Sequence, residues 1–87
     1  MDHVIRVIVY GKEGCHLCEN VISALEKIRM KQPLEIVSRD ITADPQLFER
    51  FRDIIPVVEV NGKVRLAGSA LGSPQTLETI LKRTLFA

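Results

Sequence analysis

The hydrophobic pattern of this chain changes abruptly between residues 10 and 15. Residues 4–9 (VIRVIV) are almost continuously apolar and rich in β-branched side chains, which predicts a strand buried on both faces of a sheet. The next apolar residues recur with a period of about 3.6, which predicts a helix from residue 15 or 16 to about Met30. We expect a loop over residues 10–14. The apolar helical positions are Cys18, Val21, Ile22, Leu25 and Ile28.

Proline and aspartate mark the boundaries of the next elements. Pro33 ends the first helix, and alternating side chains over residues 34–39 indicate a second strand. Asp44 followed by Pro45 is typical of a helix start, because aspartate can cap the helix and proline suits its first position. The expected apolar face of this short helix consists of Leu47, Phe48 and Phe51.

A hairpin signal follows in the last third of the chain. Residues 57–60 and 63–67 are two strand-like runs, and the Asn61-Gly62 pair between them is typical of a two-residue hairpin turn. We expect a loop over residues 68–72, then a final helix that begins at Ser73-Pro74. The apolar positions of that helix are Leu77, Ile80, Leu81 and Leu85.

The predicted element order is β-α-β-α-β-β-α. It indicates an α/β fold with a four-stranded mixed sheet and helices on both faces. Because helical crossovers join the first three strands, we expect these three to be parallel, with the hairpin adding an antiparallel edge strand. At 87 residues, we expect the whole chain, residues 1–87, to form a single domain.

Composition excludes several classes of partner. The formal net charge is +1: residues 1–33 carry +1 and the remainder sums to zero. Neither half therefore has the basic field expected of a nucleic-acid binder. No apolar run approaches the roughly 20 residues needed to span a bilayer. Because residues 4–9 already form a strand-like run, we expect no signal peptide ahead of it. We therefore expect a cytoplasmic monomer that binds neither nucleic acid nor a membrane.

The two cysteines, Cys15 and Cys18, lie at the junction of the first strand and helix. Two cysteines are too few for the disulfide framework of a small secreted domain. A pair at this spacing can close a disulfide, bind a metal, or do neither. Its position between a strand and a helix favours a dithiol redox site.

A disulfide-exchange site needs one ionised thiol and a second thiol within reach. Unpaired N–H groups and the positive dipole end of the helix should lower the pKa of Cys15 below the free value of about 8.5. Cys18 lies one turn deeper on the same face and should be more buried and less ionised. Cys15 would then attack a substrate disulfide, and Cys18 would resolve the mixed disulfide.

Charged residues flank the two cysteines. Lys12 would add a positive charge near the thiolate, and a protonated His16 would lower the cysteine pKa and make the pair more oxidising. Each is equally well interpreted as a solvated surface residue. Glu13 and Glu19 would oppose thiolate formation if they were close, and we expect both to be exposed.

The stretch from Tyr10 to Cys18, followed by Ile55-Pro56-Val57-Val58 and Asn61-Gly62, resembles the glutaredoxin branch of the thioredoxin superfamily. It is most similar to small glutaredoxin-like proteins with a G-C-x-L-C-type site. The resemblance covers nearly the whole chain, including the element order. It implies a thioredoxin fold and a thiol–disulfide oxidoreductase in which Cys15 is the nucleophile and Cys18 the resolving thiol.

The resemblance also implies substrate-binding residues. The Ile55-Pro56 bond would be cis and packed against the disulfide, and the backbone of Ile55 would pair with an extended substrate segment. Lys12 matches a lysine that precedes the site in many glutaredoxins. We place His16 in the same substrate-binding set because it adjoins the nucleophile.

Two departures from glutathione-binding glutaredoxins concern the partner. Ile55 stands where a threonine or similar residue usually precedes the proline. Residues 66–72 contain no Gly-Gly pair, and no acidic residue follows before Glu78. A disulfide-bearing protein is therefore at least as good an expectation as glutathione. We expect no resident cofactor, with glutathione as an alternative co-substrate and an upstream reductase that restores the dithiol.

Two other functions remain open from the sequence. A structural zinc site requires four ligands, and the candidate ligands in this chain are Cys15, Cys18, His16 and His3. His16 lies between the cysteines and would have difficulty binding the same ion, so a metal or iron–sulfur site would need two chains that each contribute a C-x-x-C pair. Alternatively, the domain is a thioredoxin-like binding module whose thiols are incidental.

Overall fold

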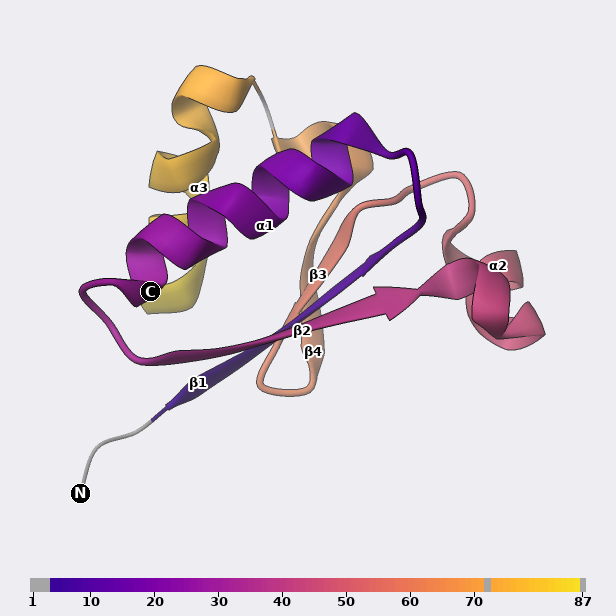
Figure 1. The fold of residues 1–87 in the computed structure, drawn as a ribbon, viewed down its shortest axis with the longest axis horizontal. Helices are drawn as coiled ribbons and strands as arrows, with labels where there is room; N and C mark the ends of the chain where they lie inside the picture. Colours follow the sequence, from indigo (N-terminus) through magenta and orange to yellow (C-terminus); the bar gives the residue numbers. More distant parts are fainter. Residues whose placement is uncertain (1–3, 72, 87) are drawn as a thin grey trace.

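The computed structural model in Figure 1 describes residues 4–71 and 73–86, with helices and strands in the predicted order. β1, α1 and β2 come first, and a short 3₁₀ turn precedes α2. The hairpin β3–β4 and a second 3₁₀ turn lead into α3. The bounds are β1 Ile5–Gly11, α1 His16–Arg29, β2 Leu34–Asp40, η1 Ile41–Ala43, α2 Pro45–Phe51, β3 Val57–Val60, β4 Lys63–Ala67, η2 Gly68–Leu71 and α3 Pro74–Phe86.

Two of the predicted loops are wrong in part. Tyr10 and Gly11 belong to β1, because they pair with Arg39 and Asp40 of β2. Of the loop expected over residues 68–72, Gly68–Leu71 is a 3₁₀ helix, and residue 72 lies outside the described residues. His3, one of the four candidate zinc ligands, also lies outside the described residues.

The sheet order is β2-β1-β3-β4, and its strand directions correct one prediction. β1 and β2 are parallel, but β3 is antiparallel to β1, with Tyr10 opposite Val57. A parallel β3 would need a crossover that returns the chain along the whole length of β2, about 23 Å for seven residues. α2 has seven residues and is only about 10 Å long, so it is too short for that return. In Figure 1 α2 lies beyond the end of β2, so the chain enters β3 from that same end.

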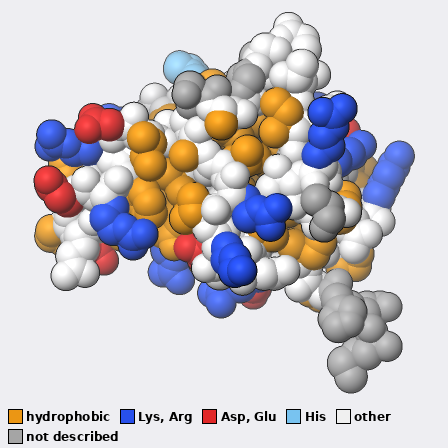
Figure 2. Space-filling view, turned by 180° about the vertical axis from the view of Figure 1, so that it is seen from behind, with side chains coloured by type: hydrophobic (Ala, Val, Ile, Leu, Met, Phe, Trp, Pro, Cys, Tyr) orange, Lys and Arg blue, Asp and Glu red, His pale blue; other side chains and the backbone are white. Residues whose placement is uncertain are grey.

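Helices cover both faces of this mixed sheet, as predicted. On one face Val7 and Val9 of β1 pack in a core with Leu25 of α1 and Leu81 of α3. On the other face Ile8 and Tyr10 form a smaller core with Ile41, Phe51 and Val57. The view from behind in Figure 2 shows apolar side chains at the surface, with lysines and arginines among them.

Two local signals produce the predicted turns. The Asp44 carboxylate accepts hydrogen bonds from the N–H groups of Gln46 (2.8 Å) and Leu47 (3.4 Å), so it caps α2. Asn61 and Gly62 have φ values of 49° and 90°, the left-handed pair that a type I′ hairpin turn needs. Of the apolar face expected for α2, Phe51 is buried, whereas Phe48 is 38% exposed.

A candidate redox site at the start of helix α1

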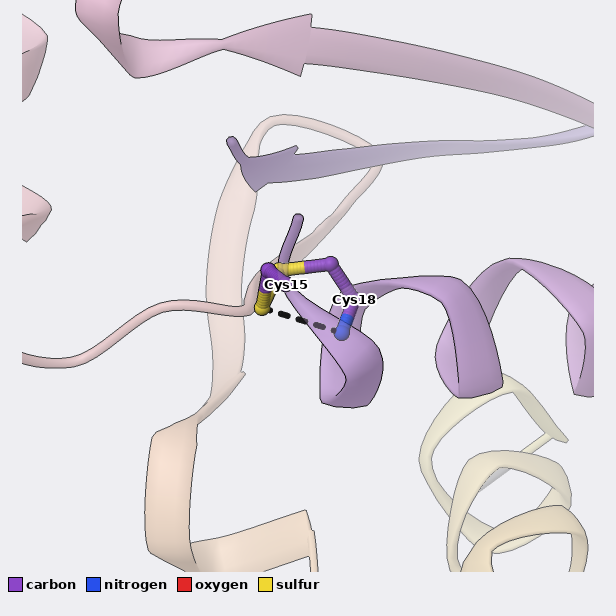
Figure 3. The surroundings of a disulfide bond; sticks show 2 residues. All are labelled: Cys15 and Cys18. Atoms are coloured by element: carbon purple, nitrogen blue, oxygen red, sulfur yellow. Dashed lines mark hydrogen bonds between the residues drawn. A yellow bond between two sulfur atoms is a disulfide. The ribbon is translucent and has the colours of Figure 1, made fainter. Parts of the chain in front are cut away.

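Cys15 and Cys18 form a disulfide at the N-terminus of α1 (Figure 3). Their Cα atoms are 5.2 Å apart, within the usual range for such a bond. Cys15 is the N-cap of α1, with extended backbone angles, and its Sγ accepts a hydrogen bond of 3.2 Å from the N–H of Cys18. This N–H is one of the groups at a helix start that the helix itself leaves without a partner. The cap therefore directs an N–H donor at the sulfur of Cys15.

The two sulfurs differ in exposure in the expected direction. Cys18 is buried, with 8% of its surface exposed, whereas Cys15 is only partly buried. Cys18 lies on the face of α1 that also buries Val21 and Leu25. A partner that approaches from solvent therefore meets Cys15 first.

The loop between β1 and α1 fixes the position of Cys15. Gly14 has a φ of 81°, so the chain turns there in the left-handed conformation. The N–H of Cys15 donates a 3.3 Å hydrogen bond to the carbonyl of Lys12. The side chains of Lys12 and His16 are exposed, and within the described residues no hydrogen bond or ion pair joins either to a cysteine. Their predicted electrostatic roles therefore stay predictions.

The Ile55-Pro56 peptide bond is cis, as the resemblance implied. Pro56 is fully buried, and its carbonyl accepts a 2.9 Å hydrogen bond from the N–H of Gly68. Val57 pairs with Tyr10 in the antiparallel ladder. Pro56, one residue before Val57, therefore lies beside Gly11, one residue after Tyr10 in β1. This register brings Pro56 to the end of β1 that precedes the cysteine loop.

Sequence reasoning missed a contact between Gly11 and Cys18. A Cβ built on Gly11 would lie 2.6 Å from the Sγ of Cys18 and 3.1 Å from its Cβ. The alternation of β1 contained a signal for this contact, because Val7, Val9 and residue 11 share one face of a strand. Gly11 is thus the last inward-facing position of β1 before the loop that leads to α1.

A hollow of about 450 Å³ adjoins the disulfide on the Cys18 side. Val9 and Gly11 of β1, loop residues 12–14, one side of α1 and the end of β2 form its wall. Asp40 belongs to this wall, and hydrogen bonds from the hydroxyl (2.6 Å) and N–H (2.8 Å) of Thr42 lower the pKa of its carboxyl group. Its charged lining residues are Lys12, Glu13, Glu19, Glu26, Arg39 and Asp40.

The decisive comparison is with protein families: residues 6–85 match the family described as a glutaredoxin-like domain (DUF836). The chain belongs to this glutaredoxin-like family. The match includes both cysteines and the cis-proline segment. No curated protein sequence matches this glutaredoxin-like domain.

Solved structures place the glutaredoxin-like domain in the thioredoxin-like fold. Protein Ne2328 from Nitrosomonas europaea is 24% identical, with a TM-score of 0.71 over 92% of this chain and 94% of that one. Thioredoxin-2 of a malaria parasite, described as a component of its protein secretion machinery, is 15% identical. Its TM-score is 0.60, over 95% of this chain and 85% of that one. At these identities the likeness concerns the fold.

Two features are absent from the part of the chain that the structure describes. In residues 4–71 and 73–86 no helix combines the length and the apolar character needed to cross a membrane. The same residues contain no group of three or more His, Cys, Asp or Glu side chains arranged to bind a metal ion.

Proposed function

We propose that this glutaredoxin-like domain is a thiol–disulfide oxidoreductase with Cys15 as the nucleophile and Cys18 as the resolving thiol. One observation carries the proposal: Cys15 caps α1 and accepts the N–H of Cys18, while its partner sulfur lies buried within bonding reach. A thiolate at a helix N-terminus is stabilised by such a donor and by the helix dipole. This arrangement supports the assignment of the nucleophile to Cys15 and of the resolving thiol to Cys18.

The proposed reaction has two exchange steps. In the first, the Cys15 thiolate attacks one sulfur of a substrate disulfide, which forms a mixed disulfide and releases the other substrate sulfur as a thiolate. In the second, Cys18 loses its proton and attacks the Sγ of Cys15, so that the Cys15–Cys18 bond forms and the bound substrate sulfur leaves. The substrate gains two electrons and the domain becomes the disulfide seen here. An upstream reductase must return two electrons to complete the cycle.

A disulfide-bearing protein is the substrate that the surroundings favour. Leu17, between the two cysteines, is 45% exposed, and Ile54, close to the cis-proline in the chain, is 42% exposed. Such apolar side chains suit contact with a protein segment better than with the charged tripeptide glutathione. In this proposal Ile55 and Pro56 align the segment, Lys12 adds positive charge beside the thiolate, and His16 contacts the substrate next to the nucleophile. The domain acts as a cytoplasmic monomer.

The Cys18→Ser variant is expected to accumulate a mixed disulfide through Cys15. Serine cannot attack the Cys15 sulfur, so the second exchange step stops while the first proceeds. We would incubate the reduced variant separately with oxidised glutathione and with insulin, then measure adduct mass under non-reducing conditions. Most of the variant should carry one adduct, whereas the wild type should carry less than about a tenth of that, because Cys18 resolves its adduct.

The double variant Cys15→Ser/Cys18→Ser is the matched control and should carry no adduct. The relative yield with insulin and with glutathione ranks the two substrate classes. The proposal is wrong if Cys18→Ser stays unmodified by both disulfides, or if its adduct lies on a residue other than Cys15.

A further inference from the structure

Gly11 occupies a position in β1 where the strand pattern calls for an apolar side chain. Val7 and Val9 point from β1 into the core beneath α1 and α3, and residue 11 is the next position on that face. Gly11 is buried, yet it is not among the glycines with a positive φ. Its backbone conformation is therefore open to any residue, and glycine is not required there for its conformational freedom.

The space that a side chain would fill is instead taken by Cys18. The Cβ of an alanine at position 11 would lie 2.6 Å from the Cys18 Sγ, closer than Cβ atoms approach other heavy atoms in real proteins. The contact with the Cys18 Cβ, at 3.1 Å, is tight and requires a shift of a few tenths of an ångström in either redox form. The sulfur atom is thus the group that excludes a methyl at position 11.

The two redox forms differ in how freely this sulfur can move. In the disulfide the Cys18 Sγ is bonded to Cys15, the N-cap of α1, so it cannot rotate away from β1. In the dithiol the Cys18 side chain can choose another staggered rotamer about its Cα–Cβ bond. A methyl at position 11 would therefore strain the disulfide form more than the dithiol form.

We propose that Gly11 is a positioning residue for the redox cycle. Because glycine has no side chain, the end of β1 leaves space for the Cys18 sulfur when that sulfur is bonded to Cys15. The proposal rests on the function proposed above in one respect, namely that the cysteine pair cycles between dithiol and disulfide. In the step concerned, the Cys15–Cys18 bond forms and the bond from Cys15 to the substrate sulfur breaks. The substrate leaves as a thiolate, and the Cys18 proton passes to water. Gly11 takes no part in the bonds and acts through the position of Cys18.

Gly11→Ala is expected to shift the dithiol–disulfide equilibrium toward the dithiol. Overpacking a tight contact by one methyl carries a free-energy cost that, if borne by the disulfide form, lowers the equilibrium constant for disulfide formation about tenfold. For a two-electron couple this corresponds to a reduction potential higher by ~30 mV. We would equilibrate wild type and variant in a series of glutathione redox buffers, quench with a thiol-modifying reagent, and count the modified cysteines by mass.

Val60→Ala is the matched control, because Val60 is a buried β3 residue that pairs with Val7, away from the cysteines. It should lower stability and leave the redox equilibrium within about twofold of wild type, since distant sites act independently. An equilibrium constant for Gly11→Ala that is also unchanged would overturn the proposal. Because the readout is the state of the protein's own cysteines, it stands even if the domain reduces no external substrate.

A second measurement covers the case in which Gly11→Ala folds poorly. The loss of unfolding stability caused by Gly11→Ala should be largest in the oxidised protein, smaller in the reduced protein, and smaller again in a Cys18→Ala background, where the sulfur is absent. A variant that folds only in the Cys18→Ala background supports the proposal. Equal losses in all three states, or failure to fold in that background as well, would show that the methyl meets something other than the sulfur.

Discussion

Cys15→Ser should abolish disulfide reductase activity, with a loss of roughly 10³-fold or more, as for removal of a catalytic nucleophile in general. The reacting species in disulfide exchange is a thiolate, and a serine hydroxyl is not ionised at neutral pH. The measurement is the rate of insulin reduction in the presence of dithiothreitol, with the uncatalysed rate subtracted. Retained activity would show that another group attacks the substrate.

The fold of Cys15→Ser should survive, which makes the activity loss interpretable. Cys15 is the N-cap of α1, and serine is among the best residues at that position because its oxygen accepts the N–H of a residue two or three places on. The variant should therefore match the reduced wild type in denaturant unfolding within about 1 kcal/mol. Cys18→Ser tests the division of labour when it is reduced and freed of dithiothreitol before insulin is added, since it should then react once through Cys15 without releasing the substrate.

Leu25→Ala should produce the largest loss of stability among simple core changes. Leu25 has none of its surface exposed and lies on the face of α1 that packs on β1 and α3. Truncation of a buried leucine removes apolar contacts and leaves a cavity, at a cost of about 2–5 kcal/mol. A chain of this length has a total stability of roughly 4–13 kcal/mol, so the change removes a large share. Urea unfolding of the reduced protein measures it.

Leu17→Ala is the matched control for this change. Leu17 belongs to the same helix but is 45% exposed, so the same truncation should cost less than about 1 kcal/mol. Equal losses for the two variants would contradict the account of the core in which α1 buries the face of Leu25.

Local chemistry explains which elements were predictable from sequence. The Asn61-Gly62 turn and the Asp44-Pro45 helix start each depend on residues next to one another, and both lie where predicted. The direction of β3 depends instead on where the whole segment between β2 and β3 runs, which side-chain patterning does not specify. Phe48 shows the same limit: it is 38% exposed while Phe51 is buried, and this difference depends on how α2 sits against the sheet, which the apolar pattern does not specify.

The candidate site was also predictable only where it depends on residues close together in the sequence. The cysteine spacing and the start of α1 indicated that Cys18 would be more buried than Cys15, and the structure has that difference. The wall of the hollow beside Cys18 was not foreseen, since Arg39 and Asp40 reach it through the β1–β2 register. The alternation of β1 places Gly11 on the face toward α1, but how closely the Cys18 sulfur approaches it depends on the packing of the helix, which no spacing in the sequence specifies.

Alkylation of the reduced protein tests the central claim most directly, namely that the two sulfurs are unequal and Cys15 is the reactive one. Iodoacetamide would be added in small excess between pH 5 and 9, and the modified peptides quantified by mass over time. The account predicts that Cys15 is modified first, at least about tenfold faster than Cys18 at pH 7, with appreciable reaction below pH 7, as for thiols at helix N-termini. Equal rates at the two cysteines, or reaction only above pH 8, would contradict it.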